Sequence, residues 1–261
     1  MIKLRRLLDI ISNYDRIALA YSGGVDSTFL LYVIKVVANK DVVAFTAVSD
    51  TYTDEELRFA RSFANKHKIK FKTIRTNEFG DKRFLQNTRE RCFYCKTELF
   101  SKINDLKVRY GLDVIFDGSN YSDRDDFRPG SLARKRFGVI SPLELAKMTK
   151  EEIVRYSKRL GIDGADRPPN ACLASRIPYG VYISKELVRS IAEIERYIKS
   201  LGIGVLRLRH HDYIARIETS ESDMKKILLN RDRIAKRLKM YGYKYITLDI
   251  EGYRMGSLNL L

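Results

Sequence analysis

The segment Ser22–Ser27, with the sequence Ser-Gly-Gly-Val-Asp-Ser, is the first place in this sequence where residue types and spacing point to chemistry. A short apolar run, residues 16–21, precedes the segment, and a helix-like stretch, residues 28–37, follows it. It is therefore predicted to form a turn between a buried strand and a helix. The first turn of a helix has unpaired N–H groups and a partial positive charge, which together bind anions.

Each polar or small residue of this segment suits an anion site. Gly23 and Gly24 allow the backbone to close around the anion, and Ser22 and Ser27 add hydroxyl donors. Asp26 is expected either to hold a cation or to fix the loop. The segment lacks the lysine of a Walker loop and the glycine spacing of a dinucleotide fold.

Three cysteines form the second candidate group. Cys92 and Cys95 are separated by two residues at the predicted start of a helix, so both sulfur atoms can reach one metal or cluster. On its own this pair is equally consistent with zinc, a redox couple, an iron–sulfur cluster or two inert thiols. Cys172 lies in an irregular loop beside Arg176, where it is either a buried structural thiol or part of a ligand site.

Strands alternate with helices through the first part of the chain. Buried strands are expected at residues 16–21, 41–48, 71–75 and 114–116, with helices between them. This order predicts an α/β fold, a doubly wound parallel sheet, in which ligands bind beyond the carboxyl ends of the strands. Ser49 follows the second strand and is placed with the loop at that edge, where an adenosine moiety would lie.

The order changes after the segment Asp166–Asn170. Helices are expected at residues 186–201 and 222–241, and strands at 205–210, 213–219 and 244–250. This is the pattern of a smaller α+β domain. We therefore expect two domains, residues 1–168 for nucleotide binding and residues 169–261 for substrate binding or oligomerisation.

Composition limits the class of protein. A hydrophobic content of 44% with 16 tyrosines and 12 phenylalanines is enough for a core, and no apolar run reaches the ~20 residues of a membrane span. We expect a cytoplasmic protein without a membrane partner. The net charge of +16 is consistent with a nucleic-acid partner, with phosphate-bearing small ligands or with a solvated basic face.

Several motifs in order along the chain resemble those of one family. They are Ser22–Thr28, Arg91–Phe100, Asp117–Asn120 with Arg128–Gly130, Cys172–Arg176, and the tail from Tyr245 through Glu251–Arg254 to Ser257. The first resembles the loop of the PP-loop ATP pyrophosphatases, which are adenine nucleotide alpha-hydrolase-like proteins. The whole set is similar to the LarE family of ATP-dependent sulfur transferases.

The resemblance implies a reaction. ATP, with Mg²⁺, adenylates a carboxylate of a pyridinium dicarboxylate mononucleotide, and sulfur then displaces AMP to leave a thiocarboxylate for the nickel-pincer nucleotide. Adenylation is chemically sensible because it makes a poor leaving group into a good one, while the loop and Mg²⁺ stabilise the departing pyrophosphate. Family members are homo-oligomers, and the physiological sulfur donor is not evident from the sequence.

The resemblance also assigns residues. In one branch of the family the loop cysteine gives up its own sulfur, and in the other three cysteines hold a [4Fe–4S] cluster. Since cysteine is present at all three positions, we favour the cluster, with Cys92, Cys95 and Cys172 as ligands.

Substrate binding is assigned by the same resemblance to Arg176, Arg207 and Arg209, with Glu195 as a further site residue. Guanidinium groups suit phosphate and carboxylate. The alternative for the two strand arginines is an outward-facing basic pair, and for Glu195 a solvent-facing position on a helix. The alternative function is a tRNA thiolase, which shares the PP-loop and often a three-cysteine cluster, and a third is a nucleotide-binding regulator without catalysis.

Overall fold

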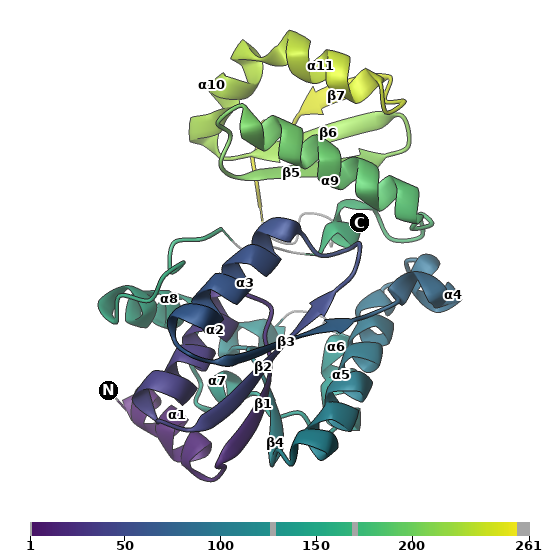
Figure 1. The fold of residues 1–261 in the computed structure, drawn as a ribbon. Helices are drawn as coiled ribbons and strands as arrows, with labels where there is room; N and C mark the ends of the chain where they lie inside the picture. Colours follow the sequence, from purple (N-terminus) through teal and green to yellow (C-terminus); the bar gives the residue numbers. More distant parts are fainter. Residues whose placement is uncertain (1, 126–128, 169–171, 255–261) are drawn as a thin grey trace. The chain divides into compact units, whose positions relative to one another are not determined.

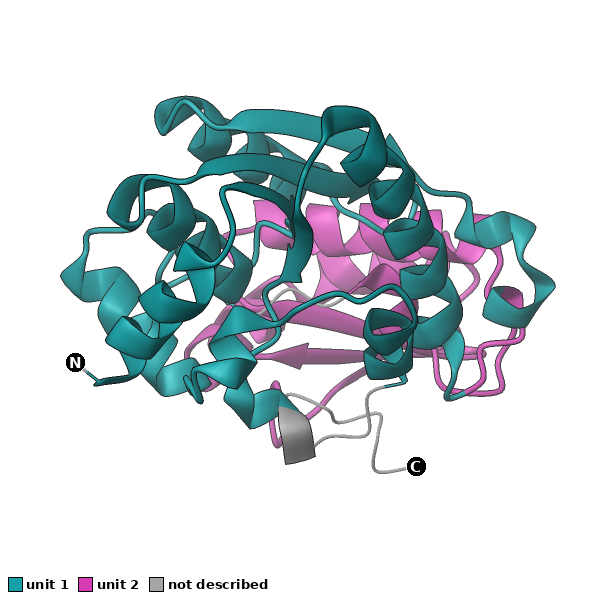
Figure 2. Ribbon diagram, turned by 90° about the horizontal axis from the view of Figure 1, so that it is seen from below, with its two compact units in different colours: residues 1–84, 89–170 teal, residues 85–88, 171–261 magenta. Residues whose placement is uncertain are grey.

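The computed structural model describes residues 2–125, 129–168 and 172–254 of the chain. The chain forms two compact units, residues 1–84 with 89–170, and residues 85–88 with 171–261 (Figure 2). The domain boundary expected after residue 168 adjoins residues 169–171, which lie outside the described residues. Each unit has a sheet of its own.

The first unit is built on a four-stranded parallel sheet. Its strands are β1 (Arg16–Ala20), β2 (Asp41–Val48), β3 (Lys70–Arg75) and β4 (Val114–Asp117), in the order β3-β2-β1-β4. Helices cover both faces of this sheet (Figure 1). The predicted α/β fold with a parallel sheet and a second, smaller domain is therefore confirmed.

The two faces of the sheet bury different side chains, as the alternation along a strand requires. Ile17 and Leu19 pack into one core with helices α1 (Ile2–Ser12), α2 (Val25–Tyr32), α3 (Asp54–Lys66), α7 (Pro142–Leu145) and α8 (Lys150–Arg159). Ala18 packs into the other core with α5 (Arg91–Tyr110) and α6 (Gly130–Arg136). Because both faces are buried, β1 is apolar without interruption from Ile17 to Ala20.

Helix starts follow the local signals in the sequence. Helices α3 and α8 each start with a capping box, in which a threonine (Thr53 or Thr149) is followed three residues later by a glutamate (Glu56 or Glu152). Helix α5 begins at Arg91, as the helix start predicted around Cys92 and Cys95 requires. Both Cys92 and Cys95 therefore lie in its first turns.

The second unit carries a three-stranded mixed sheet. Strands β5 (Leu206–His211) and β6 (Ile214–Thr219) are antiparallel, and β7 (Tyr245–Leu248) runs parallel to β6. Helices α9 (Lys185–Ser200), α10 (Glu221–Leu229) and α11 (Arg231–Lys239) complete it. The single helix expected over residues 222–241 is wrong, because Asn230 leaves helical geometry and its side-chain amide caps the carbonyl of Lys226 at 2.9 Å.

Short elements complete the chain. They are η1 (Val33–Val37), η2 (Glu78–Gly80), α4 (Lys82–Leu85), η3 (Tyr121–Asp125) and η4 (Leu173–Arg176). The segment 85–88 belongs to the second unit through backbone bonds, from Ile183 N–H to the Leu85 carbonyl (2.9 Å) and from Gly180 N–H to the Asn87 carbonyl (3.0 Å). Within the described residues, no helix combines the length and the apolar character needed to cross a membrane.

Candidate functional site

The Ser22–Ser27 loop connects the end of β1 to the start of α2. Gly24 is the N-cap residue of α2, and Gly23 has a positive φ of 72°. The Ser22 hydroxyl lies 3.0 Å from the Ser27 hydroxyl and accepts a hydrogen bond from Gly24 N–H (3.3 Å). The two serines therefore close the loop. The free N–H groups of the first turn of α2 lie at the end of this loop.

Close packing against two neighbouring segments fixes the loop. A Cβ atom on Gly23 would lie 3.3 Å from the Ala60 side chain, and one on Gly118 would lie 2.8 Å from the Cα of Ser27. The hydroxyl of Tyr52 also donates a hydrogen bond to the Ser22 carbonyl. Glycine is thus required at Gly23 for its φ and at Gly118 for space.

Asp26, in the first turn of α2, is held by two donors that the sequence did not single out as partners. Lys150 Nζ lies 2.8 Å from Oδ1, and Asn120 Nδ2 lies 3.2 Å from Oδ2. Burial raises the pKa of this carboxyl above its usual value of 3.8, and the Lys150 charge opposes that rise only in part. Asp26 is thus a partly buried carboxylate paired with a protein cation.

Ser49 lies at the end of β2, the strand that pairs with β1 in parallel register. Its hydroxyl lies 2.9 Å from that of Thr51 and accepts a hydrogen bond from Thr51 N–H (3.2 Å). Because Tyr52, three residues further on, reaches the Ser22 carbonyl, Ser49 and the loop lie at the same edge of the sheet.

Cys92 and Cys95 lie one helical turn apart on α5, so their side chains share a face of the helix. Cys92 is exposed and Cys95 is half-buried. The Cys95 thiol donates to Glu78 Oε1 at 3.6 Å and lines a pocket of about 390 Å³ together with Glu98 and Lys102. A thiol pair of this spacing has the donor chemistry of a shared metal or cluster ligand.

Cys172 is described in the second unit, as the N-cap residue of η4. Its side chain is exposed, and its carbonyl accepts hydrogen bonds from Ser175 N–H (2.9 Å) and Arg176 Nη1 (3.2 Å). Over the described ranges, no three His, Cys, Asp or Glu side chains are grouped so that they could hold a metal. The structure thus describes the three predicted ligands in two separate parts, a helical pair and a loop residue.

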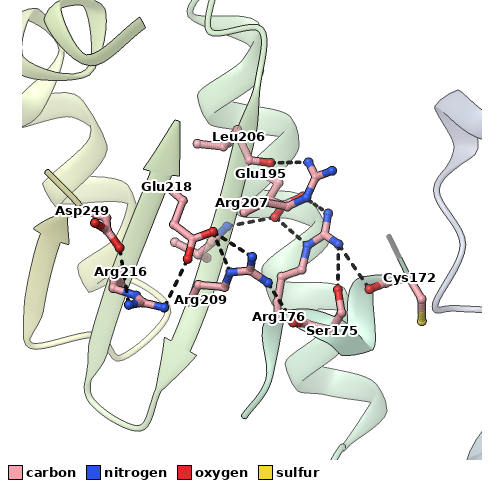
Figure 3. Close-up of polar contacts among 11 residues, drawn as sticks. Cys172, Ser175, Arg176, Glu195, Leu206, Arg207, Arg209, Arg216, Glu218 and Asp249 are labelled. Carbon is pink, nitrogen blue, oxygen red and sulfur yellow. Dashed lines mark hydrogen bonds and ion pairs between the residues drawn. The ribbon is translucent and has the colours of Figure 1, made fainter. Parts of the chain in front are cut away.

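The second unit contains a cluster of charged side chains, most of them buried (Figure 3). Arg176 is 1% exposed and binds Glu195 in bidentate fashion, with Nε–Oε1 at 2.9 Å and Nη2–Oε2 at 3.0 Å. Burial favours the neutral acid, but the charge and hydrogen bonds of Arg176, together with the hydrogen bond from Leu208 N–H (2.9 Å) and the charge of Arg207, keep the pKa of Glu195 below its usual range. Glu195 is therefore not the solvent-facing helix residue of the alternative interpretation.

Arg209 lies in the same cluster. Its guanidinium group donates twice to Glu218 Oε2, at 2.9 and 2.7 Å, and once to the Ser175 carbonyl at 2.9 Å. Glu218 is fully buried and also accepts from Arg216, which lies 3.4 Å from Asp249 (Figure 3). Sequence reasoning missed Glu218, although Arg216 and Glu218 alternate on β6 as the two arginines do on β5.

Arg207 is the third arginine of the cluster and is 3% exposed. Its Nη1 donates to the Leu206 carbonyl at 2.7 Å, and its guanidinium lies 5.0 Å from the centre of the Tyr253 ring. Burial and the nearby charge of Arg176 lower the pKa of Arg207. The outward-facing interpretation of the strand arginines is therefore wrong, since both are buried.

Comparison with known proteins follows the whole length of the chain. An uncharacterized protein from Synechocystis sp. is 35% identical over 259 residues, which cover 98% of this chain and 97% of that protein. Pyridinium-3,5-bisthiocarboxylic acid mononucleotide synthase from Lactiplantibacillus plantarum is 31% identical over 258 residues, 98% of this chain and 94% of the synthase. The chain belongs to the LarE family.

A comparison with another enzyme of known activity is narrower than this LarE match. The tRNA(Ile)-lysidine synthase of Persephonella marina is 30% identical over 179 residues, 59% of this chain and 37% of that enzyme. No protein-family model matches the chain. As a LarE protein with the PP-loop fold, the chain is an ATP-dependent enzyme.

Proposed function

We propose that this LarE-family enzyme uses ATP to adenylate a carboxylate of a pyridinium-3,5-dicarboxylate mononucleotide and then converts it to a thiocarboxylate for nickel-pincer nucleotide biosynthesis. The full-length similarity to a pyridinium-3,5-bisthiocarboxylic acid mononucleotide synthase supports the substrate. The observation that carries the proposal is the buried arginine cluster, whose guanidinium groups suit an anionic ligand.

The guanidinium groups of that cluster support an anionic substrate. Arg176, Arg207 and Arg209 are all buried, and they lie in one cluster with the carboxylates of Glu195 and Glu218. The phosphate or carboxylates of the mononucleotide would form bidentate bonds with guanidinium groups.

ATP is assigned to the loop of the first unit. The N–H groups at the start of α2 and the hydroxyls of Ser22 and Ser27 would bind its phosphates, and Ser49 would lie beside the adenosine. Asp26 provides the hard carboxylate oxygens that Mg²⁺ prefers, and Mg²⁺ would neutralise charge on the departing pyrophosphate.

Sulfur is assigned to the three cysteines. We favour Cys92, Cys95 and Cys172 as ligands of a [4Fe–4S] cluster, which would supply an extra sulfide when bound. Two thiols one turn apart on α5, and an exposed third thiol, suit such ligands. In the alternative, Cys172 gives up its own sulfur and becomes dehydroalanine.

We also place this enzyme in the cytoplasm as a homo-oligomer. Reduced thiols are the rule there, and none of the three cysteines is in a disulfide. Leu228, Leu229 and Met240 are exposed on the α10–α11 segment and offer apolar surface to another copy of the chain. Light scattering of the purified protein tests the assembly.

One anaerobic preparation tests the proposed reaction. Iron and acid-labile sulfide are measured first, and the protein is then given ATP with either the pyridinium mononucleotide or tRNA. We expect pyrophosphate, AMP and a thiocarboxylate when ATP is supplied with the mononucleotide, and no thiolated product when ATP is supplied with tRNA. Thiolated tRNA would instead show the tRNA thiolase function. Absence of iron, with Cys172 losing the mass of one sulfur, would overturn the cluster and keep the function.

A further inference from the structure

The tail that follows β7 folds back onto β6 and carries Tyr253. Asp249 N–H donates to the Ile217 carbonyl at 2.9 Å, and Tyr253 N–H donates to the Thr219 carbonyl at 2.8 Å. Between these two bonds, Gly252 N–H donates to the Asp249 carbonyl at 3.1 Å, which closes a tight turn. The backbone of Tyr253 is therefore fixed against the last residue of β6.

Further contacts hold this turn in place. The Asp249 carboxylate accepts a hydrogen bond from Glu251 N–H at 3.0 Å and lies 3.4 Å from the Arg216 guanidinium. A Cβ atom on Gly252 would lie 2.9 Å from a carbonyl oxygen of β6, so the turn packs directly on that strand. The tail motif Glu251–Arg254, to which the family resemblance gave no role, thus forms a fixed support for one side chain.

The side chain on this support is an aromatic ring that packs on a buried cation. The centre of the Tyr253 ring lies 5.0 Å from the central carbon of the Arg207 guanidinium, within the range of a cation–π contact. Arg207 is 3% exposed, and Tyr253 is half-buried. The tail therefore contacts one of the three arginines assigned to substrate binding.

Two contacts limit the orientation of the Arg207 guanidinium group. Its Nη1 donates to the Leu206 carbonyl at 2.7 Å, and the Tyr253 ring lies next to it. All N–H groups of a guanidinium lie in its plane, so an anion binds along its edge. A guanidinium that is already fixed loses less side-chain freedom when an anion binds, and this favours binding.

We propose that Tyr253 is a positioning residue of the arginine cluster, whose ring fixes the Arg207 guanidinium for an anionic group of the mononucleotide. This inference rests on the proposed use of the cluster for that substrate. It adds a residue outside the cluster and gives the tail motif a role in binding. Because the ring makes the contact, the hydroxyl of Tyr253 is not needed, and phenylalanine should replace tyrosine without loss.

Calorimetric titration with the pyridinium mononucleotide tests the role of the ring. We expect Tyr253→Leu to weaken binding by about 3- to 30-fold, and Tyr253→Phe to bind like wild type. Tyr245→Leu is the control, because Tyr245 is exposed on β7 of the same unit, and its affinity should not change. Unchanged affinity in Tyr253→Leu, or an equal loss in Tyr253→Phe, would overturn the inference.

A double-mutant cycle separates this role from a general effect on the fold. In the Arg207→Met background, Tyr253→Leu should cause no further loss of mononucleotide affinity, because the guanidinium that the ring fixes is absent. A further loss of the same size as in wild type would show that Tyr253 does not act through Arg207. Such a result would overturn the inference.

A series of fluorinated phenylalanines at position 253 gives a second test, which holds even if Tyr253→Leu does not fold. Fluorine keeps the shape of the ring but withdraws negative charge from its face, which weakens a cation–π contact. We expect mononucleotide affinity to fall as fluorine atoms are added. Constant affinity along the series would contradict the proposed contact.

Two further titrations distinguish failure of the inference from failure of the proposed function. If wild type does not bind the mononucleotide, the proposed substrate is wrong and the inference is wrong with it. If Arg207→Met weakens binding and Tyr253→Leu does not, only the inference is wrong. An ATP analogue with a methylene bridge between the α and β phosphates should bind Tyr253→Leu as it binds wild type. An equal loss for both ligands would show a disturbed fold and would overturn the inference.

Discussion

The Ser22–Ser27 loop of the first unit and the arginine cluster of the second, the two proposed anion sites, are built in opposite ways. The loop offers backbone N–H groups and two serine hydroxyls, with one partly buried ion pair between Asp26 and Lys150. The cluster is made of side chains, and the pairs Arg176–Glu195 and Arg209–Glu218 are almost completely buried. A site made of backbone depends on shape, and a site made of buried charges depends on every partner being present.

The largest expected effect comes from breaking a charge pair of the cluster. Glu195→Gln leaves the guanidinium of Arg176 buried without its carboxylate, and we expect a loss of about 3–5 kcal/mol in the free energy of unfolding, measured with urea. Glu193→Gln is the matched control, because Glu193 is exposed on the same helix. Similar losses for the two variants would show that the cluster does not stabilise the unit.

In the Ser22–Ser27 loop, the corresponding disruption is a steric clash. Gly118→Ala would place a Cβ atom 2.8 Å from the Cα of Ser27, and we expect a loss of about 1–3 kcal/mol in stability together with weaker binding of ATP. Gly204→Ala is the control, since its Cβ would meet Asp223 at an ordinary 3.4 Å. Full ATP affinity in Gly118→Ala would mean that the close approach does not fix the loop.

Acid should weaken the cluster through Glu195. Its folded-state pKa lies below the usual 4.5 because the Arg176 charge and hydrogen bonds, with smaller effects of Leu208 and Arg207, together outweigh the effect of burial. A carboxyl with a lowered pKa stabilises the fold above its unfolded pKa, and the stabilisation is lost as the pH falls through the folded pKa. The stability difference between wild type and Glu195→Gln should therefore shrink below pH 4.5. A constant difference on acidification would contradict the assignment.

We expect the smallest effect from removing one helix cap in each unit. Thr149→Ala and Ser184→Ala each remove a side chain that accepts an N–H at the start of a helix, α8 or α9, and each should cost about 1 kcal/mol in thermal unfolding. Only Thr149→Ala should also lower ATP affinity, because the next residue, Lys150, contacts Asp26 of the Ser22–Ser27 loop. Equal ATP affinity in the two variants would show that the cap of α8 does not influence the Ser22–Ser27 loop.

The same contrast explains what the sequence could predict. The parallel sheet, the loop at a helix start and the capping boxes at Thr53 and Thr149 follow from short-range patterns, so the sequence is enough to predict them. Lys150 was not, because its contact with Asp26 joins residues 124 positions apart. Glu218 was missed for a similar reason, since its partner Arg209 lies on the neighbouring strand.

Two features of the second unit also depend on tertiary structure. The break at Asn230 interrupts a stretch whose composition favours one helix, and the segment 85–88 joins this unit from far along the chain. No periodicity of residues 85–88 indicates that Asn87 would donate to the carbonyls of Pro178 (2.7 Å) and Val181 (2.9 Å). Such contacts join residues that are far apart in the sequence, so local patterns do not indicate them.

The central claim is that the loop binds ATP and the arginine cluster binds the mononucleotide. Arg207→Met tests it directly, with calorimetric titration of the variant by the pyridinium mononucleotide and, separately, by the ATP analogue. The account predicts mononucleotide affinity at least about tenfold weaker, with analogue affinity unchanged. Unchanged mononucleotide affinity, or an equal loss for both ligands, would contradict it.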